Sequence, residues 1–213
     1  MQGFINYFKE FWPLFIVLFV LLIALFFMFK KASKTLQKAK AEKEKLIKKL
    51  DHMKLIRETY SDLSEEKIIS DDGKNLLEGV TDNIQLRLEK SSDMNESFFS
   101  LKEEEKLCYA YFFFLDESKV APSEFFKQYS KPLTPYALQA CEKLLEKDAF
   151  ILVKEMYDTY DEDNETKSVI PETVKELDDK IKALIDIEEE KLKAADFIKK
   201  NAEKFIWLFT DCL

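Results

Sequence analysis

Glycine, proline, histidine and cysteine are all scarce in this chain of 213 residues, which has three glycines, five prolines, three cysteines and one histidine. A phosphate-binding loop needs closely spaced glycines, and Gly3, Gly73 and Gly79 cannot form one. Because few residues break helices and 46% of the chain is apolar, long helices around a packed core are expected.

The cysteines and the single histidine argue against metal, disulfide and catalytic chemistry. Cys108, Cys141 and Cys212 are odd in number and show no CxxC spacing, which predicts a reducing compartment and no zinc site. Cys212 stands second from the end and does not match the prenylation motif. His52 has no second histidine or nearby cysteine to work with. The sequence therefore predicts a protein that is not an enzyme and holds no cofactor or metal.

Charge is abundant, and it is segregated along the chain. The net charge is −8. Residues 30–60 carry eleven Lys or Arg against four Asp or Glu, a balance of +7. Residues 61–213 carry 21 against 36, a balance of −15. A basic block before an acidic body requires an explanation.

The run FWPLFIVLFVLLIALFFMF at 11–29 contains 19 residues and no charge. At about 1.5 Å per residue, a helix of this length approaches the roughly 30 Å thickness of a bilayer core. The run predicts a transmembrane helix, with residues 1–10 as a short extracytoplasmic N-terminus. A cleaved signal peptide fits less well, because its apolar region is shorter and its basic residues come before that region.

The lysines after this run predict its orientation. Only Lys9 precedes it, whereas five lysines follow within eleven residues. These five, expected to lie against anionic headgroups at the membrane surface, are Lys30, Lys31, Lys34, Lys38 and Lys40. The positive-inside rule then predicts a single-pass protein of the cell membrane, with the N-terminus outside and the C-terminal region cytoplasmic.

Residues 30–60 are expected to form a basic juxtamembrane helical stalk. A weak heptad runs through Leu36, Ala39, Lys43, Leu46, Leu50, Met53, Arg57 and Tyr60. Two cationic core positions weaken it, so the pattern fits either a solvated helix or a homodimeric coiled coil. Residues 61–99 follow as a linker with an amphipathic helix over 74–90.

The segment 100–171 shows an ordered series of shorter elements. Ser100 with Glu103 reads as a capping box, and further helices are expected to begin at Pro122 and Thr134. FILVKEMY at 150–157 reads as a strand, DTYDEDNE as an acidic turn, and 167–170 as a returning strand. This order resembles the winged-helix superfold. The expected fold class is mainly α, with a transmembrane helix, a helical stalk, a small winged-helix-like α+β module and a C-terminal helix; the alternative is a four-helix domain with an incidental hairpin.

The resemblance implies a third helix in the DNA major groove and a wing on the backbone, but the charge opposes DNA. Residues 100–171 contain nine Lys, no Arg and fifteen Asp or Glu, so the module would repel phosphates. A nucleic-acid partner is therefore disfavoured, and the module is expected to face a protein.

The arm 172–213 has no glycine or further proline and carries a helical apolar stripe. It predicts one long helix, or two with a break near 188–191. Its apolar end suggests a partner-binding surface made by Phe205, Ile206, Trp207 and Phe209. Packing of this end on the preceding domain, or docking on the membrane face, are the alternatives.

These features predict a membrane-anchored cytoplasmic adaptor or scaffold, a subunit of an envelope-associated assembly. The expected partners are the membrane and one or more proteins, with a homodimer through the stalk or the C-terminal helix as a further option. A membrane-tethered winged-helix transcription regulator is the main alternative, and an enzyme with an unusual carboxylate site is a third class.

Overall fold

A computed structural model describes the backbone of residues 2–160 and 171–206. Within the first helix it leaves out the side chains of 2–16, 24–27, 29, 31–35 and 38. The chain divides into two compact units, Met1–Lys54 and Leu55–Leu213.

The first unit consists of most of helix α1, Gln2–Tyr60. From residue 32 to 60 the helix contains neither glycine nor proline and is rich in Lys, Leu, Ala and Glu, which have high helix propensity. Its last turn, from Leu55 onward, belongs to the second unit.

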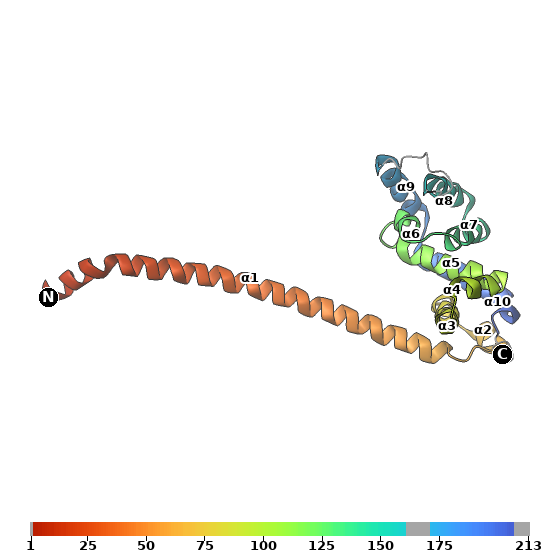
Figure 1. The fold of residues 1–213 in the computed structure, drawn as a ribbon, viewed down its shortest axis with the longest axis horizontal. Helices are drawn as coiled ribbons and strands as arrows, with labels where there is room; N and C mark the ends of the chain where they lie inside the picture. The colour runs from red at the N-terminus through yellow and green to blue at the C-terminus, as the bar shows by residue number, and fades with distance from the viewer. Residues whose placement is uncertain (1, 161–170, 207–213) are drawn as a thin grey trace. The chain divides into compact units, whose positions relative to one another are not determined.

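The second unit is built of short helices around α5, Glu103–Ser118. Helix α5 packs on α3, α6, α7 and α10, and Figure 1 shows it between the α6–α9 group and the α2–α4 group. The remaining bounds are α2 Glu65–Ser70, α3 Leu76–Lys90, α4 Met94–Ser100, α6 Pro122–Gln128, α7 Leu133–Leu144, α8 Lys147–Tyr160, α9 Pro171–Leu184, α10 Ile187–Lys200 and a 3-10 turn at Ala202–Lys204.

Helix α5 is central because it is apolar on most of its circumference. Leu107, Cys108, Tyr111, Phe114 and Leu115 are all buried. The Phe114 ring lies edge-on to the Phe125 ring of α6, with centroids 5.7 Å apart. Residues 107–115 of this helix contain no charged side chain, and α3, α6, α7 and α10 pack around α5 to cover them.

Asp186 produces the break in the C-terminal arm. Its carboxylate accepts hydrogen bonds from the backbone N–H groups of Glu188, at 3.0 Å, and Glu189, at 3.3 Å. This is an N-cap, so α9 ends at Leu184 and α10 begins at Ile187. The arm is therefore two helices, and the break lies just before the predicted 188–191.

The winged-helix-like module of the expected fold class is contradicted. The residues that the structure describes contain no strand, and the predicted strand 150–157 lies inside α8. The buried positions of α8 are Ala149, Val153 and Met156, spaced by four and three residues. This period places apolar side chains on one helix face, and it outweighs the strand propensity of the individual residues. The predicted returning strand, 167–170, lies outside the described residues.

The predicted transmembrane helix at 11–29 is also contradicted. Within the described part of the chain, no helix offers a stretch that is long and apolar enough to cross a membrane. The predictions of a single-pass anchor and of a cell-membrane localisation are therefore wrong. The backbone of residues 11–29 is part of α1.

Candidate interaction surface

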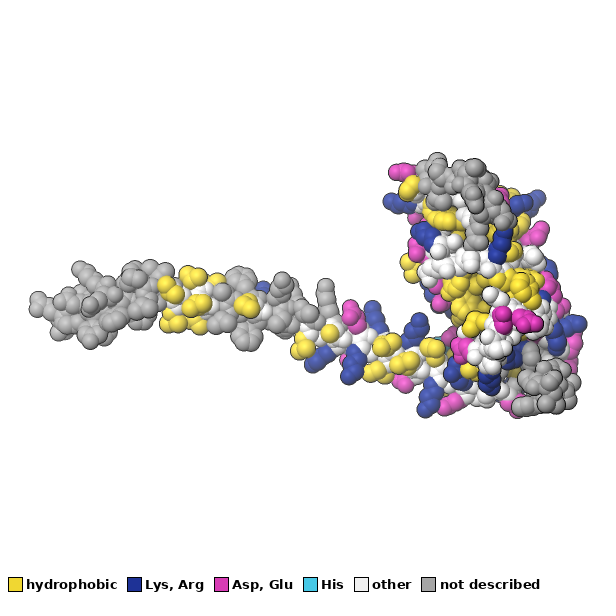
Figure 2. Space-filling model, in the orientation of Figure 1, with side chains coloured by type: hydrophobic (Ala, Val, Ile, Leu, Met, Phe, Trp, Pro, Cys, Tyr) yellow, Lys and Arg dark blue, Asp and Glu magenta, His cyan; other side chains and the backbone are white. Residues whose placement is uncertain are grey.

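C-terminal to the exposed apolar run 17–23, α1 carries an exposed apolar stripe. It consists of Leu46, Ile47, Leu50 and Met53, whose exposed fractions are 58%, 46%, 55% and 44%. We call these four residues the apolar stripe. Figure 2 shows hydrophobic side chains interspersed with Lys along this helix. Full burial of one such side chain stabilises a protein or a complex by about 1.5–3 kcal/mol. Because each side chain of the stripe is about half exposed, a partner that covers it could gain about half of that free energy.

The apolar stripe follows a coiled-coil seam. With Lys43 and Leu50 at position a, Leu46 and Met53 fall at d and Ile47 at e. Successive a and d residues lie on one face of a helix, which makes a continuous surface for another helix. The seam also contains Leu36, at position a and 60% exposed, nearer the N-terminus.

Charged residues beside the seam are mostly basic. Positions a, e and g between 40 and 54 hold Lys40, Lys43, Lys49 and Lys54 against Glu42, a balance of +3. Positions b, c and f over the same range hold Lys45 and Lys48 against Glu44 and Asp51, a balance of zero. The positive charge of this segment is therefore concentrated at the edges of the apolar stripe.

The seam ends where α1 joins the second unit. Ile56 and Tyr60 are 2% and 5% exposed, and the Tyr60 hydroxyl donates to an Asp71 carboxylate oxygen at 2.8 Å. Arg57 forms an ion pair with Asp82 of α3 at 2.9 Å. Burial and the bond to Asp71 raise the pKa of Tyr60. These contacts hold the last turn of α1 on α3.

Gly79 of α3 makes this packing sterically feasible. A Cβ atom placed on Gly79 would lie 2.2 Å from Cγ of Tyr60. Gly79→Ala is expected to lower the free energy of unfolding by about 1–3 kcal/mol, because the ring must move. This loss exceeds the gain of about 1 kcal/mol in helix propensity. Urea denaturation will measure the net change in the free energy of unfolding. Hydrogen exchange of residues 55–60 will show whether the end of α1 opens more readily.

A double-mutant cycle provides the control for this contact. In a Tyr60→Ala background the obstructing ring is gone, so Gly79→Ala should become neutral or stabilising by up to about 1 kcal/mol. If Gly79→Ala destabilises both backgrounds equally, the Tyr60 ring is not the cause.

A cavity lies where α5, α6, α9 and α10 meet. This half-open cavity of about 310 Å³ is lined by Ser118, Lys119, Pro122, Ile181, Lys182, Ile185 and Ile187. Both lysines already have partners, because Lys119 pairs with Asp116 and Lys182 donates to the carbonyl of Val120. The cavity is thus an apolar hollow whose rim cations are engaged.

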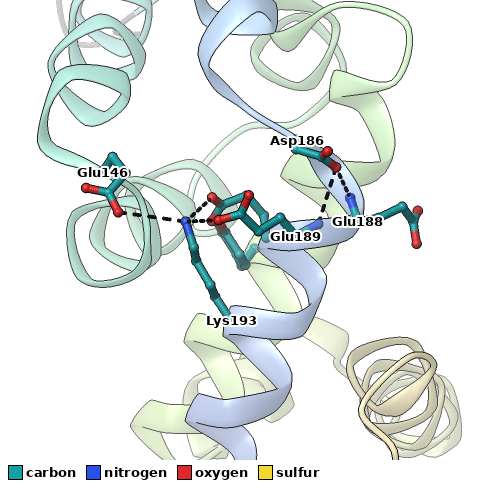
Figure 3. Close-up of polar contacts among 7 residues, drawn as sticks. Glu146, Asp186, Glu188, Glu189 and Lys193 are labelled. Carbon is teal, nitrogen blue, oxygen red and sulfur yellow. Dashed lines mark hydrogen bonds and ion pairs between the residues drawn. The ribbon is translucent and has the colours of Figure 1, made fainter.

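A polar cluster gathers around Lys193 of α10. The Lys193 ammonium lies 2.8 Å from Glu190, 3.2 Å from Glu189 and 3.9 Å from Glu146, which stands between α7 and α8 (Figure 3). Hydrogen bonding to Glu190 is the main cause that raises the pKa of Lys193. Two of these contacts lie within α10, and the third, to the exposed Glu146, reaches the segment between α7 and α8.

Glu190 extends this cluster into the core. It is 4% exposed and accepts a hydrogen bond of 2.8 Å from the hydroxyl of Tyr111, which is fully buried on α5. Burial raises the pKa of Tyr111 and of the nearby Cys141 thiol, and Glu190 adds to both. The raised pKa values keep Tyr111 and Cys141 neutral, and a neutral buried thiol is a poor nucleophile. The Tyr111–Glu190 hydrogen bond connects α5 to α10.

Two of the three cysteines are buried thiols. Cys108 and Cys141 are both 0% exposed, and burial raises the pKa of each. Across the residues that the structure describes, no three His, Cys, Asp or Glu side chains are grouped so as to hold a metal ion.

The structure locates some of the residues predicted as sites. Lys30 and Lys40 are exposed on α1, whereas the side chains of Lys31, Lys34 and Lys38 lie outside the described set. Of the predicted partner-binding end, Phe205 is 1% exposed and packs in the core, and Ile206 is half-buried. Trp207 and Phe209 lie outside the described residues.

Sequence reasoning identified part of the apolar stripe and missed the rest. Leu46, Leu50 and Met53 belong to the predicted heptad, but Ile47 does not, because it occupies a flanking position. The Tyr111–Glu190 pair was missed as well, because no local pattern marks two residues that meet across the fold. The one local sign is that Glu190 occupies a position on the apolar face of its helix, between Ile187 and Ala194.

Comparisons with protein-family models, with curated proteins and with solved structures find no match.

Proposed function

We propose that this chain is a protein-interaction protein of the adaptor or scaffold type, which binds a protein partner through the apolar stripe of α1. The observation that carries the proposal is the exposure of Leu46, Ile47, Leu50 and Met53, at 44–58%, along one seam. Contiguous exposed apolar side chains between polar neighbours are typical of protein-binding surfaces. The a/d spacing indicates that the partner contributes a helix.

The second unit supports this proposal through its charge chemistry. Its buried carboxylates contact other groups of the unit, as in the Glu190–Tyr111 and Arg87–Glu105 contacts. A catalytic site instead positions such groups toward a substrate. The unit accordingly supplies a stable folded body at the end of the interaction helix.

Site-specific photo-crosslinking in cells tests the proposal. A photoreactive phenylalanine analogue replaces Ile47 in the seam or Lys45 at position c of the same helix turn. We expect a crosslinked adduct of defined mass with a second protein from position 47 and not from position 45. The contact requires the seam, so the double substitution Leu46→Asp/Leu50→Asp should abolish the adduct.

A matched control isolates the seam from added charge. Ala41→Asp/Leu55→Asp introduces the same two carboxylates at f positions, away from the seam, and should preserve the adduct. Equal crosslinking from positions 45 and 47, or none from either, would contradict the proposed function.

A further inference from the structure

The positive charge at the edges of the apolar stripe indicates which charge the partner carries. In paired helices, residues at e and g lie beside the seam and face the corresponding residues of the other helix. Here those edges and the central a position hold four lysines and one glutamate, while the far side of α1 is balanced. Such asymmetry selects partners by charge.

A second copy of the chain paired in parallel register, or antiparallel with Lys43 opposite Met53, would bring these lysines together. In a parallel pair, Lys49 of one copy faces Lys54 of the other, and Lys43 faces itself at the seam. In the antiparallel pair that sets Lys43 opposite Met53, Lys49 faces Lys49 and Lys40 faces Lys54.

Glu42 does not relieve this repulsion. It faces Ile47 of the other copy in the parallel arrangement and Ile56 in the antiparallel one. Both of these arrangements therefore place lysines opposite lysines across the seam, and like-charge contacts of this kind disfavour a partner.

We infer that the apolar stripe of α1 binds an amphipathic helix that carries Asp or Glu beside its own apolar seam. This inference rests on the proposed function and adds the chemistry of the partner. Carboxylates at the partner's flanking positions would face Lys40, Lys49 and Lys54, and a carboxylate opposite Lys43 would neutralise the one cation within the seam.

The shape of the stripe favours a helix over a lipid surface. Leu46, Leu50, Met53 and Ile47 cover an arc of about 120° at 100° per residue, with Lys43 inside that arc. Helices that lie in a lipid interface bury a broader apolar face and commonly carry aromatic residues there. Residues 40–55 contain no aromatic side chain.

Binding of two designed peptides to the full-length chain tests this inference. Each peptide is a helix of about four heptads with leucine at a and d. One carries glutamate and the other lysine at e and g. Fluorescence anisotropy should show that the acidic peptide binds about tenfold or more tightly than the basic one, a difference of about 1.4 kcal/mol. The preference should shrink at high salt, because the flanking charges are exposed.

Three variants separate charge from apolar contact. The charge reversal Lys40→Glu/Lys49→Glu/Lys54→Glu should invert the preference between the peptides while retaining helicity by circular dichroism. Leu46→Asp/Leu50→Asp should abolish binding of both peptides, and Ala41→Asp/Leu55→Asp should leave the acidic peptide bound.

Four results would overturn the inference. The first is equal affinity for both peptides, and the second is equal binding of a scrambled acidic peptide that has no seam. The third is self-association of the chain that is tighter than its binding to the acidic peptide. The fourth is binding to vesicles containing anionic lipid that is tighter than binding to the acidic peptide. A stripe-specific crosslink in cells together with any of these results would retain the proposed function and reject the acidic partner. The absence of the crosslink would reject the proposed function itself.

Discussion

Replacing Glu105 with alanine is expected to lower the free energy of unfolding of the second unit by about 3–5 kcal/mol. The Glu105 carboxylate is 1% exposed and accepts from Arg87 of α3 at 2.7 Å and from the backbone N–H of Lys102 at 3.0 Å. Without it, the guanidinium charge of Arg87, whose side chain is only 18% exposed, loses this counter-ion in the α3–α5 interface. Urea denaturation followed by far-UV circular dichroism measures the loss.

Two matched substitutions show whether burial of the charge pair is the cause. Glu103→Ala removes an acid from the same helix turn, but that side chain is 51% exposed, so the cost should stay near 0.5 kcal/mol, about the effect of one charge on the helix dipole. Glu105→Gln keeps the shape and the acceptor for Lys102 and should fall between the two. Similar stability of the alanine variants at 103 and 105 would show that the buried pair does not hold α3 to α5.

Phe114→Ala should cost about 3–5 kcal/mol, the usual range for removing a fully buried aromatic ring. Phe114 is 0% exposed, and its ring centroid lies 5.7 Å from that of Phe125 and 6.2 Å from that of Phe126. The ring fills the space between α5 and α6, so its loss leaves a cavity that the surrounding helices cannot fully close. Chemical denaturation gives the loss, and hydrogen exchange should show faster exchange throughout α6.

Phe99→Ala serves as the comparison, because that ring is 57% exposed on α4. Its removal should change stability by no more than about 0.5 kcal/mol. A loss at position 114 no larger than at position 99 would mean that the α5–α6 contact contributes little to the core.

These stability predictions and the binding predictions concern separate parts of the chain. Substitutions in the apolar stripe fall on exposed positions of the first unit, so they should alter binding with little change in the unfolding of the second unit. Glu105 and Phe114 lie in the core of the second unit and should do the opposite. This division allows a loss of binding to be told apart from a loss of folding.

The sequence by itself determined the features that depend on neighbouring residues. A helix expected over 74–90 corresponds to α3, Leu76–Lys90, and Pro122 stands at the first position of α6. Leu46, Leu50 and Met53 could be read as one seam because heptad spacing is local, and the lysines beside them follow from the same register. Where propensity and period disagreed, at 150–157, the helical period prevailed, because burial against α7 and α9 rewards a continuous apolar face.

Only the tertiary structure decided which distant residues meet. Tyr60 packs on Gly79, Arg87 pairs with Glu105, and Tyr111 bonds to Glu190, although 79 positions separate the last two. It also showed that Phe205 is a core residue while the apolar stripe stays exposed, though both read as apolar surfaces in the sequence. The physical reason is that periodicity defines which side of a helix is apolar, whereas the packing of other helices decides whether that side is covered.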